Sequence, residues 1–210
     1  MQILDKETWP RKEIYEFFSR IDYPFYSVTL PLDVTNVRAF ARAQGLSFYH
    51  LLIWACTKAL NRLPAFRLRI RGEDLVLLDG ADPSFTSMRP GEEVFQIITL
   101  PWEADPRAFC AHAGEKAARQ ATLLDQAAET DELIYFSCTP WFDFTALTNE
   151  HNFDRDDSVP RLAWGKYYEE GGRLWVHLSV EVNHRLIDGV HLGQLKQALD
   201  EEIAALGGFN

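Results

Sequence analysis

The sequence predicts an α+β fold, and three observations support this. Several segments repeat apolar residues at helical spacing, and several shorter ones are apolar and bounded by turn residues, as β-strands are. Near the C-terminus, two strand-like segments flank Glu170-Gly171-Gly172 in the manner of a hairpin. Because no internal repeat and no linker divides the chain, we expect one domain over residues 1–210.

Five helices are expected. The first begins at Pro10, and the third is apolar on almost every face, which is typical of a buried helix. Gly45 is expected to end the second helix, and Gly207 to cap the last. The segments are 10–21, 35–44, 47–61, the Ala-rich stretch 106–128, and a final helix that follows Asp188-Gly189.

Strands are expected between these helices. The candidates are Phe66 to Arg71, Leu75 to Leu78, Val94 to Leu100, Leu133 to Ser137, Ala163 to Tyr168 and Arg173 to Val182. The segment Thr145 to Ser158 is polar and predicts a loop, and its acidic run Asp154 to Asp157 is interpreted as solvated.

The last strand directs attention to His184. Apolar and polar residues alternate along Arg173 to Val182, and continuing that alternation puts His184 on the face of the valines. Histidine can accept a proton near pH 7, and Asp188, in the turn before the last helix, is placed to support it. Arg11 and Arg185 are both candidates to hold the Asp188 carboxylate. Taken alone, the HxxxDG spacing favours a structural histidine.

Composition narrows the function classes. The net charge of −10 argues against a nucleic-acid surface and favours a small-molecule or protein partner. The sequence contains no apolar run long enough to span a bilayer and no signal region at its start, so we expect a cytoplasmic protein. Three cysteines without CxxC spacing predict neither a disulfide framework nor a zinc site, and His184 with His191 lacks further metal ligands.

Six segments, in order along nearly the whole chain, resemble chloramphenicol acetyltransferases. They are Trp9-Pro10-Arg11-Lys12-Glu13 (WxRxE in the family), Ser47-Phe48-Tyr49 (KFYP), Asn61 to Arg67 (NQFPEFR), Asp82 to Thr86 (DPxFT), Ser137 to Phe144 (SxLPWxNF), and Glu181 to His191 (VHHAVCDGFH). The resemblance implies a two-layer sandwich in which helices cover one face of a mostly antiparallel mixed sheet. It also implies a homotrimer with active sites at the subunit interfaces.

The same resemblance assigns roles to residues. It implies that His184 is the general base, Asp188 its buried support, Arg11 the ion-pair partner of Asp188, and Ser137 the hydroxyl that stabilises the tetrahedral oxyanion. Acetyl-CoA is the implied co-substrate, with no permanently bound cofactor and no metal. Residues implied to lie towards CoA are Tyr49, Trp141, Lys166 and Tyr167, and those implied to line the acceptor pocket are Phe18, Tyr26 and Phe95.

Departures from the family pattern leave the acceptor open. Asn183, Arg185 and Ile187 replace a histidine, an alanine and a cysteine of the family, Ala163 replaces a threonine, and Phe18 replaces a tyrosine. The segment Asn183 to Gly189 is also similar to the DHRxxDG segment of dihydrolipoamide acyltransferase cores.

Two alternatives to an O-acetyltransferase therefore remain. One is an enzyme of the same fold that acts on a thiol or an amine, and the other is a non-catalytic trimeric binding protein. Chemistry at Cys138 is not favoured, because Cys138 directly follows Ser137 and strand alternation is expected to point it to the opposite face, away from His184.

Overall fold

A mixed β-sheet forms the centre of the computed structural model, which describes residues 1–208. Within these residues its strands are β2 (Phe25–Asp33), β5 (Asp82–Met88), β6 (Phe95–Thr99), β7 (Leu133–Thr139), β8 (Arg161–Gly165), β9 (Tyr168–Glu170) and β10 (Arg173–Asn183). The spatial order is β2-β10-β8-β7-β5-β6, with β9 paired to one end of β10. All pairs are antiparallel except that β7 runs parallel to both β5 and β8.

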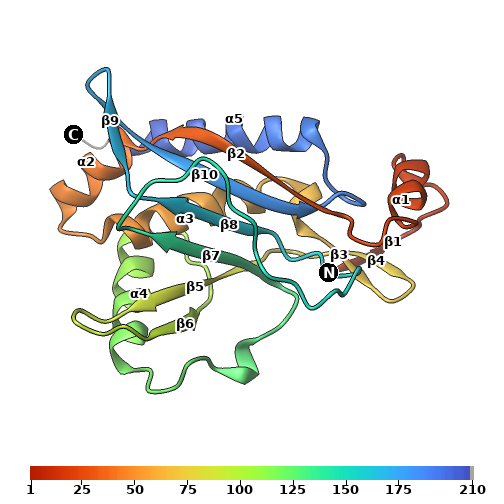
Figure 1. Cartoon of the computed structure of the whole chain (residues 1–210), viewed down its shortest axis with the longest axis horizontal. Coiled ribbons are helices and arrows are strands. Elements are labelled where there is room, and N and C mark those ends of the chain that lie inside the picture. Colours follow the sequence, from red (N-terminus) through yellow and green to blue (C-terminus); the bar gives the residue numbers. More distant parts are fainter. Residues whose placement is uncertain (209–210) are drawn as a thin grey trace.

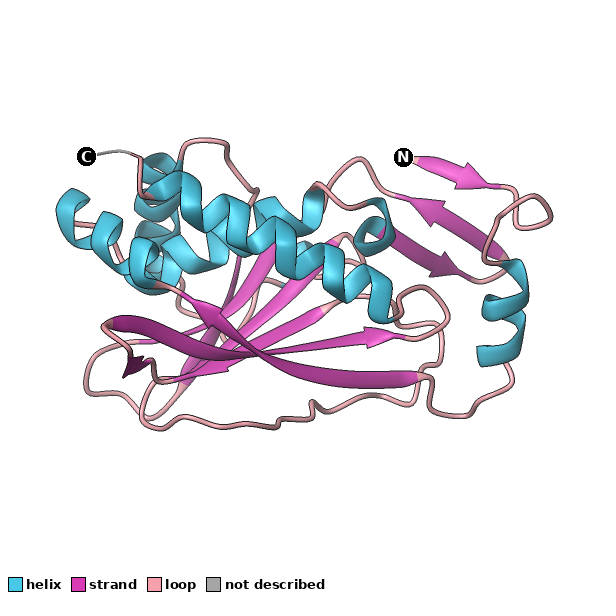
Figure 2. Cartoon of the chain, turned by 90° about the horizontal axis from the view of Figure 1, so that it is seen from above, coloured by secondary structure: helices cyan, strands magenta, loops and turns pink. Residues whose placement is uncertain are grey.

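Helices cover one face of this sheet (Figure 1). They are α2 (Thr35–Gln44), α3 (Phe48–Asn61), α4 (Pro106–Arg119) and α5 (Gly189–Leu206). The central helix is α3, which contacts the other three. Val176, Leu178 and Val180 of β10 are fully buried beneath this layer. Figure 2 shows the two layers from the side, and the predicted sandwich with helices on one face is confirmed.

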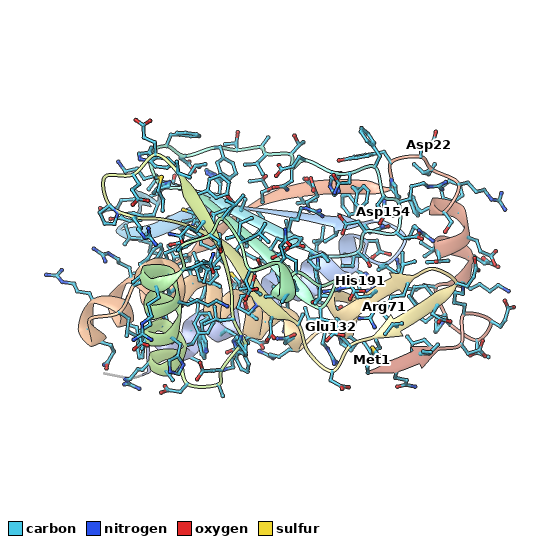
Figure 3. All side chains as sticks on the ribbon, turned by 90° about the horizontal axis from the view of Figure 1, so that it is seen from below. Met1, Asp22, Arg71, Glu132, Asp154 and His191 are labelled. Carbon is cyan, nitrogen blue, oxygen red and sulfur yellow. The ribbon has the colours of Figure 1, made fainter. Side chains whose placement is uncertain are left out.

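A small antiparallel sheet and a short helix occupy one end of the molecule (Figure 2). The sheet has the order β1-β4-β3, built from β1 (Gln2–Leu4), β3 (Leu68–Arg71) and β4 (Asp74–Leu77), and the helix is α1 (Lys12–Phe18). Arg71 of β3 ties this sheet to the chain before β7 through ion pairs with Asp131 and Glu132, at 2.7 and 2.9 Å (Figure 3). The small sheet therefore fixes the N-terminal segment that leads into α1.

Most helix predictions are confirmed. The second helix ends before Gly45, whose φ of 67° is left-handed, and Ser47 caps α3 by accepting a hydrogen bond from the His50 N–H. The helix expected over 106–128 is wrong beyond Arg119. There, the side chain of Gln120 donates to the carbonyl of Ile97 in β6, and the chain leaves the helix to run beside that strand. A 3-10 turn, η2 (Gln126–Ala128), follows.

The strand predictions were less complete. The segment predicted as a strand from Phe66 begins as a 3-10 turn, η1 (Pro64–Arg67), before β3. The strands β1, β2 and β5 were not predicted. In β2, Pro31 interrupts the strand pattern, but β2 is an edge strand and needs no ladder hydrogen bond from every residue. The hairpin is confirmed, with Gly171 and Gly172 both at positive φ.

The other face of β10 is covered by the loop between β7 and β8. Glu181 is 2% exposed and lies 2.7 Å from Nε2 of His151, a loop residue whose side chain is also 2% exposed. Asp157 pairs with Arg161 at 2.6 Å, and Asp156 pairs with Arg185. The interpretation of the acidic run as solvated is therefore wrong for Asp157, whose side chain is 20% exposed, whereas Asp156 is 44% exposed and pairs with Arg185 at the surface.

Candidate active site

His184 is the first residue after β10. Its backbone N–H donates to the carbonyl of Pro24 at 2.7 Å, and the carbonyl of Asn183 accepts from both Leu186 and Ile187. These bonds close a tight turn that carries the chain from the end of the strand to the start of α5. The position of His184 is therefore fixed by main-chain contacts on both sides.

The His184 ring lies against two aromatic rings. Its centroid is 3.8 Å from that of Phe18 in α1, in a stacked geometry, and 4.4 Å from that of Tyr26 in β2. Tyr26 pairs with Val182, so the ring does continue on the face of the valines. Burial lowers the pKa of His184 below its usual 6.5. The charge of Asp188 raises this pKa and the charge of Arg11 lowers it, and the net shift is downward. The neutral imidazole, the form that accepts a proton, is thus favoured at pH 7.

Asp188 caps α5 and is held by Arg11. Its Oδ1 accepts from the N–H of Val190 at 3.2 Å, while Oδ2 accepts from Nη1 of Arg11 at 2.5 Å. Burial alone would raise the pKa of Asp188. The hydrogen bond and the charge of Arg11 outweigh this effect, so the pKa is lowered overall. Among the described residues these bonds occupy both carboxylate oxygens. Asp188 is therefore tied to the start of α5 and to the residue before α1, and within residues 1–208 it makes no direct hydrogen bond to the His184 ring.

Arg185 does not pair with Asp188, the role for which the sequence made it a candidate. Its guanidinium pairs with Asp156 at 2.5 Å and donates to the hydroxyl of Tyr15 at 2.6 Å. Asn183, on the other side of His184, donates to the carbonyls of Arg155 and Asp157. The two residues that flank the histidine therefore attach the β7–β8 loop. Arg185 attaches α1 as well, through Tyr15.

Sequence reasoning missed the part played by His191. The backbone N–H of Asp188 donates to Nδ1 of His191 at 3.1 Å, which completes a reciprocal cap at the start of α5. Burial lowers the pKa of His191, in agreement with an unprotonated Nδ1 that accepts this bond. The signal was available in the sequence as a capping residue three positions after Asp188.

Ser137 lies far from His184 within one chain. Across the sheet, Ser137 of β7 pairs with Ala163 of β8, which pairs with Ser179 of β10. Ser179 lies five residues before His184. At about 3.3 Å per residue this is ~16 Å along the strands, in addition to two strand spacings. Ser179 also faces away from the helices, whereas His184 follows the opposite face. One chain does not bring the hydroxyl and the imidazole together.

Phe95 belongs to the same distant region as Ser137. It lies on β6, at the edge of the sheet opposite to β2, and is 48% exposed. Phe85 pairs with both Ile98 and Phe136 and points into the core, so Phe95, three residues before Ile98, faces away from the helices. Apart from the residues implied to face CoA, the predicted site thus separates into two groups, one around His184 and one, Ser137 and Phe95, on the outer face of β6 and β7.

The comparisons with known proteins agree on one family. The family model of chloramphenicol acetyltransferase matches residues 1–200. The chain belongs to the chloramphenicol acetyltransferase family. Chloramphenicol acetyltransferase 3 of Escherichia coli is 28% identical over 201 residues, which is 94% of each chain, and a Streptomyces acrimycini enzyme is 28% identical over 205 residues, 96% and 93% of the two chains. The protein is therefore an acetyltransferase of this family.

Solved structures extend the likeness to the fold. A chloramphenicol acetyltransferase superimposes with a TM-score of 0.86 at 27% identity and covers 96% of this chain and 99% of its own. The cubic core of the pyruvate dehydrogenase multienzyme complex superimposes with a TM-score of 0.70 at 22% identity, over 91% and 87% of the two chains. The fold of this chain is thus shared with the cubic core of the pyruvate dehydrogenase multienzyme complex as well as with a chloramphenicol acetyltransferase.

Residues implied to face CoA gather where β7 and β8 end. The backbone N–H of Lys166 donates to the carbonyl of Phe142, next to Trp141, and the Tyr167 ring lies 5.8 Å from that of Phe48 in α3. Trp141 and Tyr167 are 65% and 40% exposed. The Tyr49 hydroxyl, in contrast, is committed to the carbonyl of Thr86 at 2.8 Å. Three of the four residues are therefore exposed, whereas the hydroxyl of Tyr49 is already used within the chain.

The three cysteines are free thiols. Cys138 pairs with Trp164 and lies on the helix-facing side of the sheet, opposite to Ser137. Because His184 follows this same face, the prediction that Cys138 points away from His184 is wrong. Burial raises the pKa of Cys138 to about 12, so this thiol is not a nucleophile near neutral pH. Across residues 1–208, His, Cys, Asp and Glu side chains form no group of three or more that could hold a metal ion. Over the same range, no helix is both long and apolar enough to cross a bilayer.

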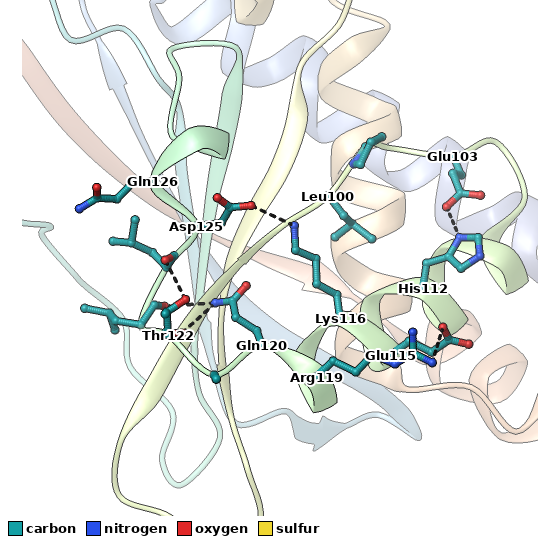
Figure 4. Close-up of a pocket in the computed structure, with 14 residues that line it drawn as sticks. Leu100, Glu103, His112, Glu115, Lys116, Arg119, Gln120, Thr122, Asp125 and Gln126 are labelled. Carbon is teal, nitrogen blue, oxygen red and sulfur yellow. Dashed lines mark hydrogen bonds and ion pairs between the residues drawn. The ribbon is translucent and has the colours of Figure 1, made fainter.

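One surface groove lies away from all of these residues. It has a volume of about 1280 Å³ and runs between α4 and the segment 120–126 (Figure 4). Its charged side chains are paired among themselves, as His112 with Glu103 at 2.6 Å and Lys116 with Asp125 at 4.0 Å. The groove contains no residue that sequence reasoning assigned to the site.

Proposed function

We propose that the protein transfers the acetyl group of acetyl-CoA to a hydroxyl of a small, partly apolar acceptor, with His184 as general base. The observation that carries the proposal is the environment of His184. Its ring, with a lowered pKa, lies against Phe18 and Tyr26 beside the Arg11–Asp188 pair, in a chain of the chloramphenicol acetyltransferase family. A neutral imidazole that is held between two aromatic rings is suited to take a proton from an alcohol.

The transfer is direct. His184 takes the proton of the acceptor hydroxyl, and the oxygen attacks the thioester carbonyl to form a tetrahedral intermediate. The Ser137 hydroxyl donates a hydrogen bond to its oxyanion. When the intermediate collapses, the carbon–sulfur bond breaks, and the proton held by His184 passes to the CoA sulfur. Orientation of both substrates replaces any covalent enzyme intermediate.

Ser137 acts in this scheme from a neighbouring subunit. The separation of Ser137 and Phe95 from His184, on opposite faces of one sheet, supports a site shared between two copies of the chain. We propose a homotrimer, in which each interface joins the His184 group of one subunit to the outer sheet face of the next. Acetyl-CoA binds over Trp141, Lys166 and Tyr167 and is released as CoA after each turnover.

Acceptors other than alcohols are less well supported. The arrangement expected for a dihydrolipoamide acyltransferase-like site pairs Arg185 with Asp188, but Arg185 pairs with Asp156. We further propose that the protein acts in the cytoplasm, which is supported by its three free thiols.

The proposal is tested by acetyl-CoA consumption, followed as thiol release, against a panel of acceptors. The panel contains chloramphenicol, simple aryl alcohols, an amine and dihydrolipoamide. We expect acceptor-dependent thiol release with at least one alcohol and O-acetylated product by mass spectrometry. Turnover of dihydrolipoamide or the amine alone contradicts the proposed acceptor class, and no turnover with any acceptor contradicts the enzymatic function.

A further inference from the structure

The segment from Trp141 to Asp143 crosses the end of β8 in unusually close contact. A methyl group at Gly165 would lie 2.6 Å from the Phe142 carbonyl oxygen and 2.9 Å from Cα of Asp143. Only glycine leaves room for this approach. The hydrogen bond from Lys166 N–H to the Phe142 carbonyl, at 2.8 Å, holds the main chain at the crossing.

One side-chain pair ties the crossing to the next strand. Oδ2 of Asp143 lies 2.8 Å from Nδ1 of His177 on β10. The His177 ring stacks on Tyr168 with centroids 4.9 Å apart, and its Nε2 is 3.5 Å from the Tyr168 hydroxyl. With the proton on Nδ1, His177 donates to Asp143 and presents Nε2 to Tyr168. The imidazole is thus oriented from both nitrogens.

The crossing carries residues of the proposed acetyl-CoA surface. Trp141 precedes the contact with Gly165, and Lys166 and Tyr167 follow Gly165 directly. Trp141 is 65% exposed, so its ring has little packing of its own to fix it. Its position relative to Lys166 depends on how firmly Phe142 and Asp143 are held.

We propose that Asp143 and His177 are a positioning pair that fixes the Trp141 segment and thereby sets the affinity of the enzyme for CoA thioesters. This inference rests on the proposed function, because it takes Trp141, Lys166 and Tyr167 as the CoA surface. The pair contacts neither His184 nor Ser137 in the described structure, so it acts on CoA binding and leaves the chemical step unchanged.

One member of the pair, Asp143, differs from the family pattern. Asp143 stands at the position of the asparagine in the family pattern SxLPWxNF. An asparagine also offers an oxygen to the Nδ1–H of His177 but carries no charge. Asp143→Asn should therefore keep most of the positioning effect, whereas Asp143→Ala should lose it.

The experiment compares steady-state kinetics and CoA binding by calorimetry in Asp143→Ala, Asp143→Asn and His177→Phe. The phenylalanine keeps the stacking on Tyr168 but removes the hydrogen bond. For Asp143→Ala and His177→Phe we expect KM for acetyl-CoA and Kd for CoA to rise about three- to ten-fold, as for loss of one ordinary, partly exposed hydrogen bond. We expect kcat at saturating acetyl-CoA and KM for the acceptor to stay within about twofold. The double variant should be no worse than either single variant.

His112→Ala is the matched control, because His112 of α4 and Glu103, in the segment before that helix, form a comparable pair at 2.6 Å. It should leave both KM values unchanged. A fall in kcat without a change in KM for acetyl-CoA, or an unchanged KM in both Asp143→Ala and His177→Phe, overturns the inference while the proposed function stands. Wild-type enzyme that consumes no acetyl-CoA overturns both.

Discussion

Nη1 of Arg11 donates a hydrogen bond to Oδ2 of Asp188 over 2.5 Å, across 177 positions of the sequence. The pair joins the residue before α1 to the cap of α5. Phe18, which stacks on His184, lies at the end of α1, and the turn that carries His184 ends at Asp188. One ion pair therefore couples the histidine to the aromatic ring beside it.

Asp188→Asn should lower both activity and stability, because it leaves the half-buried guanidinium of Arg11 without its counter-charge. We expect kcat to fall between roughly tenfold and 10²-fold, as a small displacement of a catalytic group does. The free energy of unfolding, measured in urea at pH 7, should fall by about 1.5–3 kcal/mol. Since the pKa of Asp188 is lowered by folding, this stabilisation is present above its usual 3.8 and is lost as pH falls through the folded value.

Arg11→Ala should reproduce much of that loss in kcat, and Arg185→Ala is the comparison. Arg185 bonds to Asp156 and Tyr15, so its removal should destabilise the β7–β8 loop with a smaller effect on kcat. If Arg185→Ala alone reproduces the effect of Asp188→Asn, the assigned pairing is wrong.

The pH profile should report a base with a lowered pKa. Burial favours neutral His184, so kcat/KM for the acceptor should be flat from pH 7 to 8 and fall as pH drops through a value below 6.5. The sign follows from the mechanism, because protonation removes the base. The measurement is acetyl transfer in constant-ionic-strength buffers from pH 5 to 9. A half-maximal pH at 7 or above contradicts this description of the site.

Phe18 should limit the use of polar acceptors. It replaces a tyrosine of the family and stacks on the base, so the hydroxyl that could bond a polar acceptor is missing. We expect simple aryl alcohols to be better acceptors than chloramphenicol, and Phe18→Tyr to raise kcat/KM for chloramphenicol. Wild-type kcat/KM for chloramphenicol of about 10⁸ M⁻¹s⁻¹ would show that the missing hydroxyl is irrelevant.

Two inactive variants should restore activity to each other if the site is shared. His184→Ala and Ser137→Ala chains, unfolded together and refolded, should form mixed trimers in which some sites combine an intact His184 with an intact Ser137. With random mixing, about a quarter of the sites are intact. The readouts are thiol release and mass by light scattering. Activity no higher than the sum of the separate variants, or an active monomer, contradicts the shared site.

The end of β10 was the part of the site that could best be predicted from the sequence. Strand alternation placed His184 correctly because β10 is regular up to Asn183, and the Asp188-Gly189 turn marked the start of α5. Periodicity alone could not choose between Arg11 and Arg185 for Asp188. That choice depends on α1 and the β7–β8 loop, which approach the turn only in the folded chain.

Contacts between distant polar residues could not be predicted. The pair of Glu181 with His151 and the pair of Asp143 with His177 each join β10 to a loop, and a loop gives no periodic signal. The strand β2 was missed because Pro31 is tolerated only at a sheet edge, and the edge position follows from topology. The overextended helix after Arg119 shows the converse error, since a high content of alanine says nothing about tertiary contacts that end a helix.

The general base is tested most directly by single-turnover acetyl transfer in His184→Ala and His184→Gln, at saturating acetyl-CoA and acceptor. The account predicts a rate constant lowered roughly 10²–10⁴-fold in both variants, with circular dichroism and CoA binding unchanged. Glutamine keeps a polar side chain against Phe18 and Tyr26 but cannot accept the proton, so it separates loss of the base from loss of packing. A rate constant in either variant equal to that of the wild type contradicts the account.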